Sequence, residues 1–186
     1  MENVKILAIV GMSGSGKSVA VDYLTEKGYP KVYFGGMILG EMERRGIEIT
    51  EENEKQFREM IRETEGSNWV VEQAIREVHS LVEAGQRRIV LDGVYSWTEY
   101  KILRHEFPGC MTFVGIVVDK KLRYQRVGER AVRPLSETEI KGRDVAEIEN
   151  LEKGGPIVAA DYYVLNNGTV PEMTERIDAI LKEIKF

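Results

Sequence analysis

Continuous apolar runs recur along the chain and alternate with stretches that carry apolar residues at helical spacing. Runs that are apolar at successive positions are typical of strands buried on both faces, as in parallel sheets. The runs are Lys5–Val10, Lys31–Phe34, Arg88–Leu91, Thr112–Val118 and Tyr162–Leu165. This alternation predicts a doubly wound α/β domain, built on a parallel five-stranded sheet with right-handed crossovers.

Three stretches show the apolar period of a helix. They are Val19–Lys27, Ser67–Glu83 and Met173–Ile184, and Gly28 is a C-cap candidate for the first. Between Gly36 and Ala84 the pattern predicts two or three helices and no strand. Such an insertion suits a lid or an acceptor-binding subdomain, and extra helices packed on one face of the sheet remain the alternative.

The composition is that of one ordinary globular domain. The chain has 186 residues, of which 42% are hydrophobic and 31% charged, so we expect a single domain over residues 1–186. Its single cysteine excludes an internal disulfide framework. A net charge of −5 argues against a protein that binds duplex nucleic acid through bulk charge. With neither a leader pattern nor an apolar run of about 18 residues, we expect a cytoplasmic protein outside the membrane; its oligomeric state stays open.

A glycine-rich motif follows the first predicted strand. Gly11–Ser18 reads GMSGSGKS, a complete match to G-x-x-x-x-G-K-S, the Walker A or P-loop motif. Glycines let backbone N–H groups point at phosphate oxygens, and the following helix adds the positive end of its dipole. We expect Lys17 to reach the β- and γ-phosphates of ATP and the Ser18 hydroxyl to bind Mg²⁺. The residues expected to bind the nucleotide here are Gly11, Met12, Ser13, Gly14, Ser15, Gly16, Lys17, Ser18 and Val19.

Phosphoryl transfer also needs a carboxylate beside Mg²⁺, usually at the carboxyl end of a neighbouring strand. Two aspartates end apolar runs, Asp92 before Gly93 and Asp119 after the fourth run. Asp119 opens a helical stretch and is better explained as a helix N-cap. Because no helix starts directly after Asp92, we favour Asp92 as the magnesium-side acid, and Asp119 remains the alternative.

Positive charge gathers between residues 120 and 133, which hold six lysines or arginines and a single acid. In phosphoryl transfer, mobile cations stabilise the negative charge that spreads over the transferred group. Arg123, Arg126 and Arg130 are three and four residues apart and therefore share one helix face. We expect a lid over about 123–143, in which Arg126 and Arg130 act on the phosphoryl group. A solvated basic helix is the alternative.

The order of these motifs resembles that of the P-loop nucleotide kinase superfamily, most closely dephospho-CoA kinase and its small archaeal kinase-like relatives. The resemblance covers nearly the full chain and rests on Gly11–Ser18, Arg62–Gly66, Asp92-Gly93, Arg123–Arg130, Arg143-Asp144 and Ala160–Gly168. It implies a P-loop NTPase fold of the nucleotide kinase type, with a helical acceptor-binding insertion over about 36–84. It also implies that Asn166, Asn167 and Gly168 pack along the adenine ring.

One segment departs from the family pattern. Relatives usually carry an acid and an arginine after the second strand, in a G-D-x-I-R segment that faces the acceptor. This chain reads Gly35-Gly36-Met37-Ile38-Leu39 there, so both charged residues are missing. The nucleotide half of the pattern is intact, and the acceptor half is altered.

The leading interpretation is an ATP- and Mg²⁺-dependent phosphotransferase, similar to dephospho-CoA kinase, that acts on a nucleotide-like small molecule. Arginines of the insertion are expected to bind the acceptor's phosphate. The residues with expected roles are Lys17, Asp92, Arg126 and Arg130 in catalysis, Ser18 and Asp92 at the metal, and Arg44, Arg58 and Arg62 at the acceptor. The missing acid favours the alternative, a regulatory P-loop NTPase that binds nucleotide with little or no kinase activity. A GTPase is disfavoured because no N-K-x-D motif is present.

Overall fold

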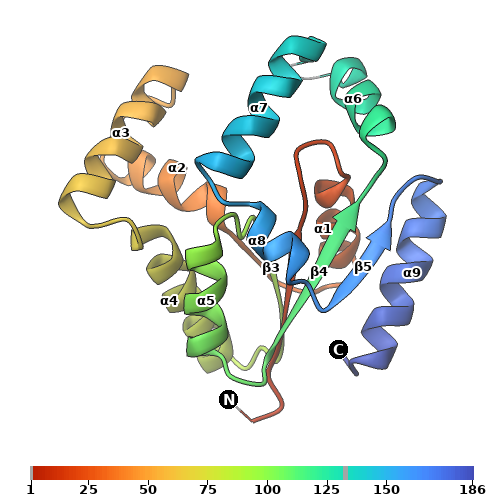
Figure 1. Cartoon of the computed structure of the whole chain (residues 1–186). Coiled ribbons are helices and arrows are strands. Elements are labelled where there is room, and N and C mark those ends of the chain that lie inside the picture. The colour runs from red at the N-terminus through yellow and green to blue at the C-terminus, as the bar shows by residue number, and fades with distance from the viewer. Residues whose placement is uncertain (1, 132–133) are drawn as a thin grey trace.

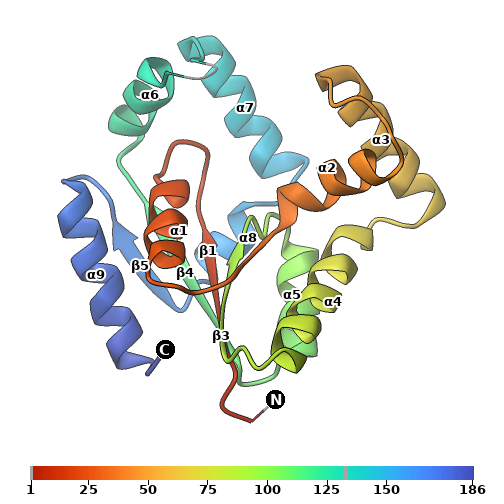
Figure 2. The same cartoon turned by 180° about the vertical axis from the view of Figure 1, so that it is seen from behind.

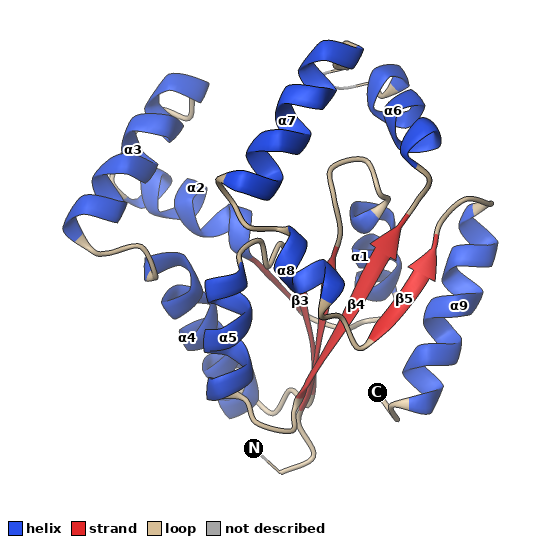
Figure 3. Ribbon diagram, in the orientation of Figure 1, coloured by secondary structure: helices blue, strands red, loops and turns tan. Residues whose placement is uncertain are grey.

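The protein is described by a computed structural model that covers residues 2–131 and 134–186. Arg133, one of the expected lid cations, lies outside the described residues. Within them, one parallel sheet has five strands in the order β2-β3-β1-β4-β5. The strands are β1 (Lys5–Val10), β2 (Lys31–Tyr33), β3 (Arg88–Asp92), β4 (Met111–Val117) and β5 (Tyr162–Leu165). The predicted doubly wound α/β fold is confirmed, and Figure 3 shows the strands between two layers of helices.

Helices follow every strand. They are α1 (Lys17–Glu26), α2 (Phe34–Arg44), α3 (Glu51–Thr64), α4 (Trp69–Glu83), α5 (Trp97–Glu106), α6 (Lys120–Glu129), α7 (Glu137–Glu149), α8 (Gly154–Val158) and α9 (Val170–Glu183). Capping boxes start α5, α7 and α9, where a serine or threonine and a glutamate three residues later satisfy free N–H groups. None of the helices in the described ranges is long and apolar enough to span a membrane.

Successive residues of the central strand β1 enter two separate cores. Ile6, Ala8 and Val10 pack with residues of α4 and α5, whereas Leu7 and Ile9 pack with residues of α1 and α9. All five are at most 1% exposed. Figures 1 and 2 show α4, α5 and α8 on one face of the sheet and α1 and α9 on the other. A strand covered on both faces needs apolar residues at every position, which explains the continuous runs in the sequence.

The insertion between β2 and β3 consists of α2, α3 and α4. Its last helix, α4, covers the sheet through Val71, Ala74 and Val78. The other two helices share a small core of their own, made of Ile38, Met42, Phe57 and Ile61, and they project sideways from the sheet (Figure 1). The α2–α3 pair therefore projects from the main body, while Phe34 at the start of α2 still belongs to the main core.

The helices α6 and α7 stand above the carboxyl ends of the strands (Figure 1). Arg123 of α6 joins them through a bidentate ion pair with Asp144 of α7, with 2.7 Å between Nη1 and Oδ1. Tyr124 adds a hydroxyl hydrogen bond to the same carboxylate. Because the Asp144 carboxylate accepts from two side chains of α6, this contact sets how α6 and α7 pack.

Candidate functional site

The predicted phosphate loop, residues 11–18, connects β1 to the start of α1. Gly14 and Gly16 have φ of +81° and +98°, a region that side chains disfavour. Each glycine also lies against a neighbour that leaves no room for a Cβ atom. The neighbour is Val127 of α6 at Gly14 and the Asn166 amide at Gly16. The two glycines are therefore required by backbone conformation and by close packing together.

Side chains from three parts of the chain hold the carbonyl groups of the phosphate loop. Lys17 Nζ donates to the Met12 carbonyl at 3.0 Å, and Arg123 Nη1 donates to the Ser13 carbonyl at 3.1 Å. The buried Asn166 amide donates to the Ser15 carbonyl at 2.8 Å. The shape of the loop is thus fixed by protein contacts before any ligand binds.

The loop borders a cavity of about 290 Å³ that is lined by polar and charged residues. Four cations, three carboxylates, two tyrosines and two serines line it: Lys17, Lys31, Arg143, Lys153, Asp22, Asp92, Glu147, Tyr33, Tyr95, Ser13 and Ser18. Convergent charged groups in one cavity are typical of a site for a small charged ligand. We call it the loop cavity.

Four of the predicted nucleotide and metal residues meet in the loop cavity: Ser13, Lys17, Ser18 and Asp92. Asp92 ends β3 and pairs in register with Ile9, so it lies beside the strand that leads into the phosphate loop. Burial raises the pKa of its carboxyl group, and the cations of Lys31 and Lys17 oppose that rise. The alternative acid, Asp119, is at the N-cap position of α6 and does not line this cavity.

The oxygen donors of the loop cavity fit Mg²⁺. The Ser18 hydroxyl and the carboxylates of Asp22 and Asp92 all line it. In the described parts of the chain, no three or more His, Cys, Asp or Glu side chains cluster as a complete metal site. Mg²⁺ usually takes one or two carboxylates and fills its other positions with water and phosphate oxygens. The set is therefore suited to Mg²⁺ that arrives with a nucleotide.

Burial lowers the pKa of Lys17 from 10.5 to about 8. The neighbouring cation Lys153 contributes to this lowering, whereas Glu147 and Asp92 oppose it. A buried ammonium group without a full counter-charge is costly. Lys17 would therefore gain much from a phosphate anion placed in the cavity.

A charged cluster in the loop cavity is made of Arg143, Glu147 and Lys153. Arg143 ends the expected lid and belongs to the Arg143-Asp144 pair of the family pattern, whereas no sequence motif identified Glu147 or Lys153. Glu147 is only 2% exposed and accepts from the Ser13 N–H at 3.0 Å. Its other contacts are Lys153 Nζ at 2.7 Å and Arg143 Nε at 3.3 Å. The spacing of four residues between Arg143 and Glu147 is enough to predict an ion pair along one helix face. Their approach to the phosphate loop depends on how α7 packs.

The arginines expected to act on the phosphoryl group lie elsewhere. Arg126 donates to the backbone carbonyls of Asn166, at 2.8 Å, and Gly168. Arg130 is the C-cap of α6, and neither arginine lines the loop cavity. Asn167 accepts from the Asp119 N–H. These contacts tie the 166–168 loop to α6, and its packing along an adenine ring stays a prediction.

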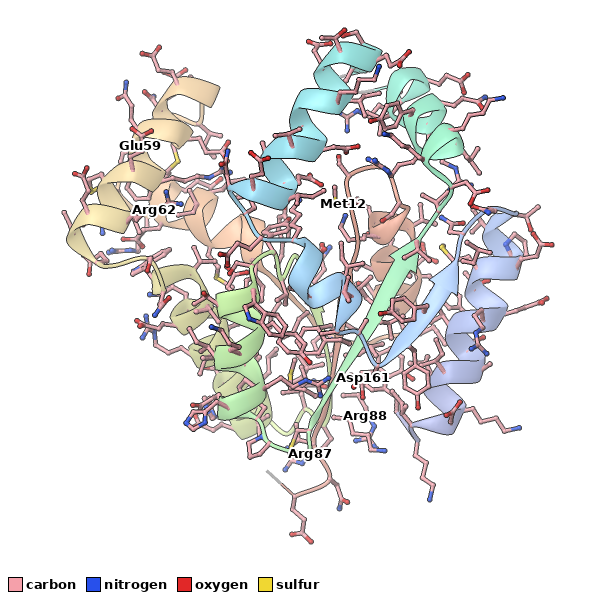
Figure 4. All side chains as sticks on the ribbon, in the orientation of Figure 1. Met12, Glu59, Arg62, Arg87, Arg88 and Asp161 are labelled. Atoms are coloured by element: carbon pink, nitrogen blue, oxygen red, sulfur yellow. The ribbon has the colours of Figure 1, made fainter. Side chains whose placement is uncertain are left out.

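The expected acceptor arginines lie on the insertion. Arg44 and Arg58 pair with Glu41 and Glu54 on their own helices. Arg62 lies on α3, well apart from the loop that carries Met12 (Figure 4). Of the three, only Arg44 lines a second cavity of about 500 Å³, formed by residues of α2 and α4. None of them lines the loop cavity.

Tyrosine rings cover the glycines at positions 35, 36 and 93. The Tyr33 ring lies over Gly35 and Gly36, so closely that a Cβ atom on either glycine would approach it within 3 Å. Tyr95 covers Gly93 in the same way. Tyr33 and Tyr95 both line the loop cavity, so two phenol groups border it.

Comparisons with known proteins agree with this architecture. No protein-family model matches the chain. The chain is 31% identical over 182 residues to a UPF0200 protein of Thermococcus kodakarensis, covering 96% of this chain and 97% of the relative. It is 32% identical over 170 residues to a UPF0200 protein of Methanosarcina barkeri, covering 90% and 89%.

Solved structures share the fold at lower sequence identity. TT1252 from Thermus thermophilus has a TM-score of 0.64 at 20% identity, with 97% of each chain covered. A shikimate kinase from Bacteroides thetaiotaomicron has a TM-score of 0.60 at 11% identity, covering 96% of this chain and 98% of the kinase. A gluconokinase from Sinorhizobium meliloti scores 0.57 at 16% identity, covering 99% and 95%. The expected P-loop kinase fold is thereby confirmed.

Proposed function

The chain belongs to the UPF0200 family, and from its phosphate loop and loop cavity we propose that it is an ATP- and Mg²⁺-dependent phosphotransferase for a small-molecule acceptor. One observation carries the proposal. Lys17, Ser18 and Asp92 meet two further cations, Arg143 and Lys153, around a single polar cavity. This combination of a phosphate cradle, metal-side oxygens and converging cations is what phosphoryl transfer requires.

Each group has a role in the proposed reaction. The phosphate loop and Lys17 hold the β- and γ-phosphates, while Ser18 and Asp92 provide oxygens for Mg²⁺. The bound metal ion would neutralise charge on the phosphate oxygens. An acceptor hydroxyl attacks the γ-phosphorus, the bond to the β,γ-bridging oxygen breaks, ADP leaves, and the hydroxyl proton is released to solvent. Arg143 and Lys153 offset the charge of the transferred group, and α6 and α7 act as the lid.

The finer proposal concerns the acceptor. We assign its reacting hydroxyl to the side of the loop cavity lined by Lys31, Tyr33 and Tyr95. Gly36, which the Tyr33 ring covers, also lines the second cavity beside Arg44. A long, nucleotide-like acceptor such as dephospho-CoA could extend from one cavity toward the other. This proximity supports a dephospho-CoA-like activity as the first one to test.

A second function is favoured by Gly35 and Gly36. Without an acid at these positions, the usual general base on the acceptor side is missing. A regulatory protein that binds and slowly hydrolyses nucleotide would not need that acid. An acceptor that stimulates ATP consumption distinguishes the two functions.

The test is Mg-ATP consumption by the purified protein with a panel of nucleosides, nucleotides, dephospho-CoA and small hydroxy acids. We expect one acceptor class to stimulate turnover and Lys17→Ala to reduce it about 100-fold, because a charged contact to the transferred group is lost. Lys182→Ala, an exposed lysine on α9, is the matched control. Unchanged ATP affinity and turnover in Lys17→Ala would refute the phosphate-loop assignment, and stimulation by no acceptor would leave the regulatory function.

A further inference from the structure

A buried carboxylate occupies the position at which a phosphate loop receives its ligand. Glu147 reaches from α7 to the Ser13 N–H at 3.0 Å, although α7 and the loop are more than 100 residues apart in the sequence. The residue is 2% exposed. A backbone N–H of a phosphate loop ordinarily donates to a phosphate oxygen. In this structure it donates to the protein's own anion.

The groups around Glu147 are those that bind an oxyanion. Lys153 Nζ lies at 2.7 Å and Arg143 Nε at 3.3 Å from its Oε1 atom, while its Oε2 atom accepts from Ser13. Two cations on Oε1 and a backbone donor on Oε2 form a charge-assisted cradle for the two carboxylate oxygens. Burial opposes ionisation of Glu147, but Lys153, the Ser13 N–H and Lys17 together hold the pKa of its carboxyl group below the usual range.

Lys153 and Glu147 each need the other's charge. Lys153 is only 7% exposed, and a buried cation needs a counter-charge. Glu147 provides that counter-charge when no other anion is present. A ligand that replaced the Glu147 carboxylate would have to bring negative charge to the same two cations.

Resting on the proposed function, we infer that the Ser13 N–H, Arg143 and Lys153 form the subsite for the terminal phosphoryl group of the nucleotide, and that Glu147 occupies this subsite until the nucleotide displaces it. Two anions cannot share the three donors, so binding of a triphosphate moves the carboxylate away. The free energy needed to displace Glu147 reduces the binding free energy of ATP and so weakens ATP binding. Because the subsite serves the last phosphate, a diphosphate gains less from it.

The first experiment uses Glu147→Gln, which keeps an oxygen to accept from Ser13 and removes the charge. We expect ATP to bind about tenfold more tightly than to the unaltered protein, with a smaller change for ADP, as measured by calorimetric titration without acceptor. Glu149→Gln, an exposed glutamate on the same helix, is the matched control and should leave both affinities unchanged.

A second variant removes the cation. Lys153→Met should weaken ATP binding about tenfold and ADP binding by less than about threefold, since only the terminal phosphate is contacted. Lys121→Met, on an exposed position of α6, is its control. The double variant Glu147→Gln, Lys153→Met removes both charges of the buried pair, so the net charge of the cluster is unchanged. It tests the subsite if either single variant fails to fold. We expect it to bind ATP with less preference over ADP than the unaltered protein.

The outcomes separate this inference from the proposed function. If the unaltered protein binds ATP and the altered proteins show unchanged ATP and ADP affinities, the subsite is wrong while the phosphotransferase proposal stands. If Glu147→Gln binds ATP and the unaltered protein does not, the displacement is supported directly. If neither binds ATP, the nucleotide function and the subsite fall together.

Discussion

At the scale of single residues, Lys17 is the clearest link between structure and ligand. Lys17 is half-buried near the cation of Lys153, and partial burial with this cation lowers its pKa to about 8. Its hydrogen bond to the Met12 carbonyl satisfies one donor but brings no negative charge. Phosphate oxygens would supply that charge and raise the pKa again. Ligand binding and protonation of Lys17 are therefore coupled.

This coupling predicts proton uptake. Near pH 8.5 about half or more of the Lys17 side chains are neutral in the empty protein. Because bound phosphate restores the charge of Lys17, ATP binding takes up protons from the buffer. ATP affinity therefore weakens as pH rises above about 8. Calorimetric titration in two buffers of different ionisation enthalpy measures the uptake. Lys17→Met should abolish it, whereas proton release on binding to the unaltered protein would contradict the assignment.

The site was only partly predictable at this scale. The phosphate-loop residues were predicted from a contiguous sequence motif, and Asp92 was predicted because it ends an apolar run. Ser13, Lys17, Ser18 and Asp92 do line the loop cavity. Glu147 and Lys153 lie close in sequence, and the Lys153 N–H donates to the Glu147 carbonyl. Their approach to Ser13 depends on how α7 packs, which no local pattern indicates. Tyr33 and Tyr95 were missed because nothing in their neighbouring residues distinguishes a ring that covers a glycine from one that faces solvent.

At the scale of elements, α6 packs directly on the phosphate loop. Val127 occupies the space that a Cβ atom of Gly14 would need, and Arg123 holds the Ser13 carbonyl. The arginine-rich sequence of α6 therefore has a structural use, since Arg123 and Arg126 bind backbone carbonyls rather than line the cavity. A charge pattern alone could not distinguish these contacts from phosphate contacts, because both need a donor on the same helix face.

The close approach of α6 to the loop can be measured against a matched glycine. Gly28 has a similar positive φ of +91°, and no atom lies within 4 Å of the position that a Cβ atom would take there. We expect Gly28→Ala to cost about 1 kcal/mol of unfolding free energy from backbone strain alone. Gly14→Ala should cost about 1–3 kcal/mol more and weaken ATP binding, because α6 or the loop must shift. Equal losses of unfolding free energy in Gly28→Ala and Gly14→Ala, measured by urea unfolding, would show that α6 does not pack tightly against Gly14.

The α6–α7 ion pair gives a second prediction for these elements. Asp144→Asn should destabilise the protein by about 3 kcal/mol because it leaves the largely buried Arg123 guanidinium without its partner. Burial opposes ionisation of Asp144, but Arg123 and Tyr124 hold its pKa below the usual value. Its contribution is therefore present above about pH 4 and is lost as pH falls further.

Urea unfolding at several pH values checks this contribution. The difference in stability between the unaltered protein and Asp144→Asn should be full at about pH 7 and shrink below about pH 4. A difference that stays constant down to about pH 2 would place the effect in packing and not in charge. Glu137→Gln, which removes an exposed ion pair on the same helix, should change stability by less than about 0.5 kcal/mol.

At the scale of the whole molecule, the sheet and the helices of the insertion were predictable, but the packing of those helices was not. Strands β1 and β5 have the bounds that their apolar runs predict, because double-sided burial leaves a strong pattern in the sequence. The insertion divides into α4, which covers the sheet, and the α2–α3 pair with its own small core. Both have amphipathic sequences, so periodicity indicates that each helix is buried somewhere without indicating its partner.

The hydrogen bond from Asn166 to the Ser15 carbonyl has a consequence for biosynthesis. It joins the first loop of the chain to a residue that follows the last strand. A ribosome releases the phosphate-loop sequence long before that residue emerges, and the side chain that braces the loop is then still missing. A growing chain can therefore complete its nucleotide cradle only when β5 has joined the sheet, so full ligand affinity marks a finished molecule.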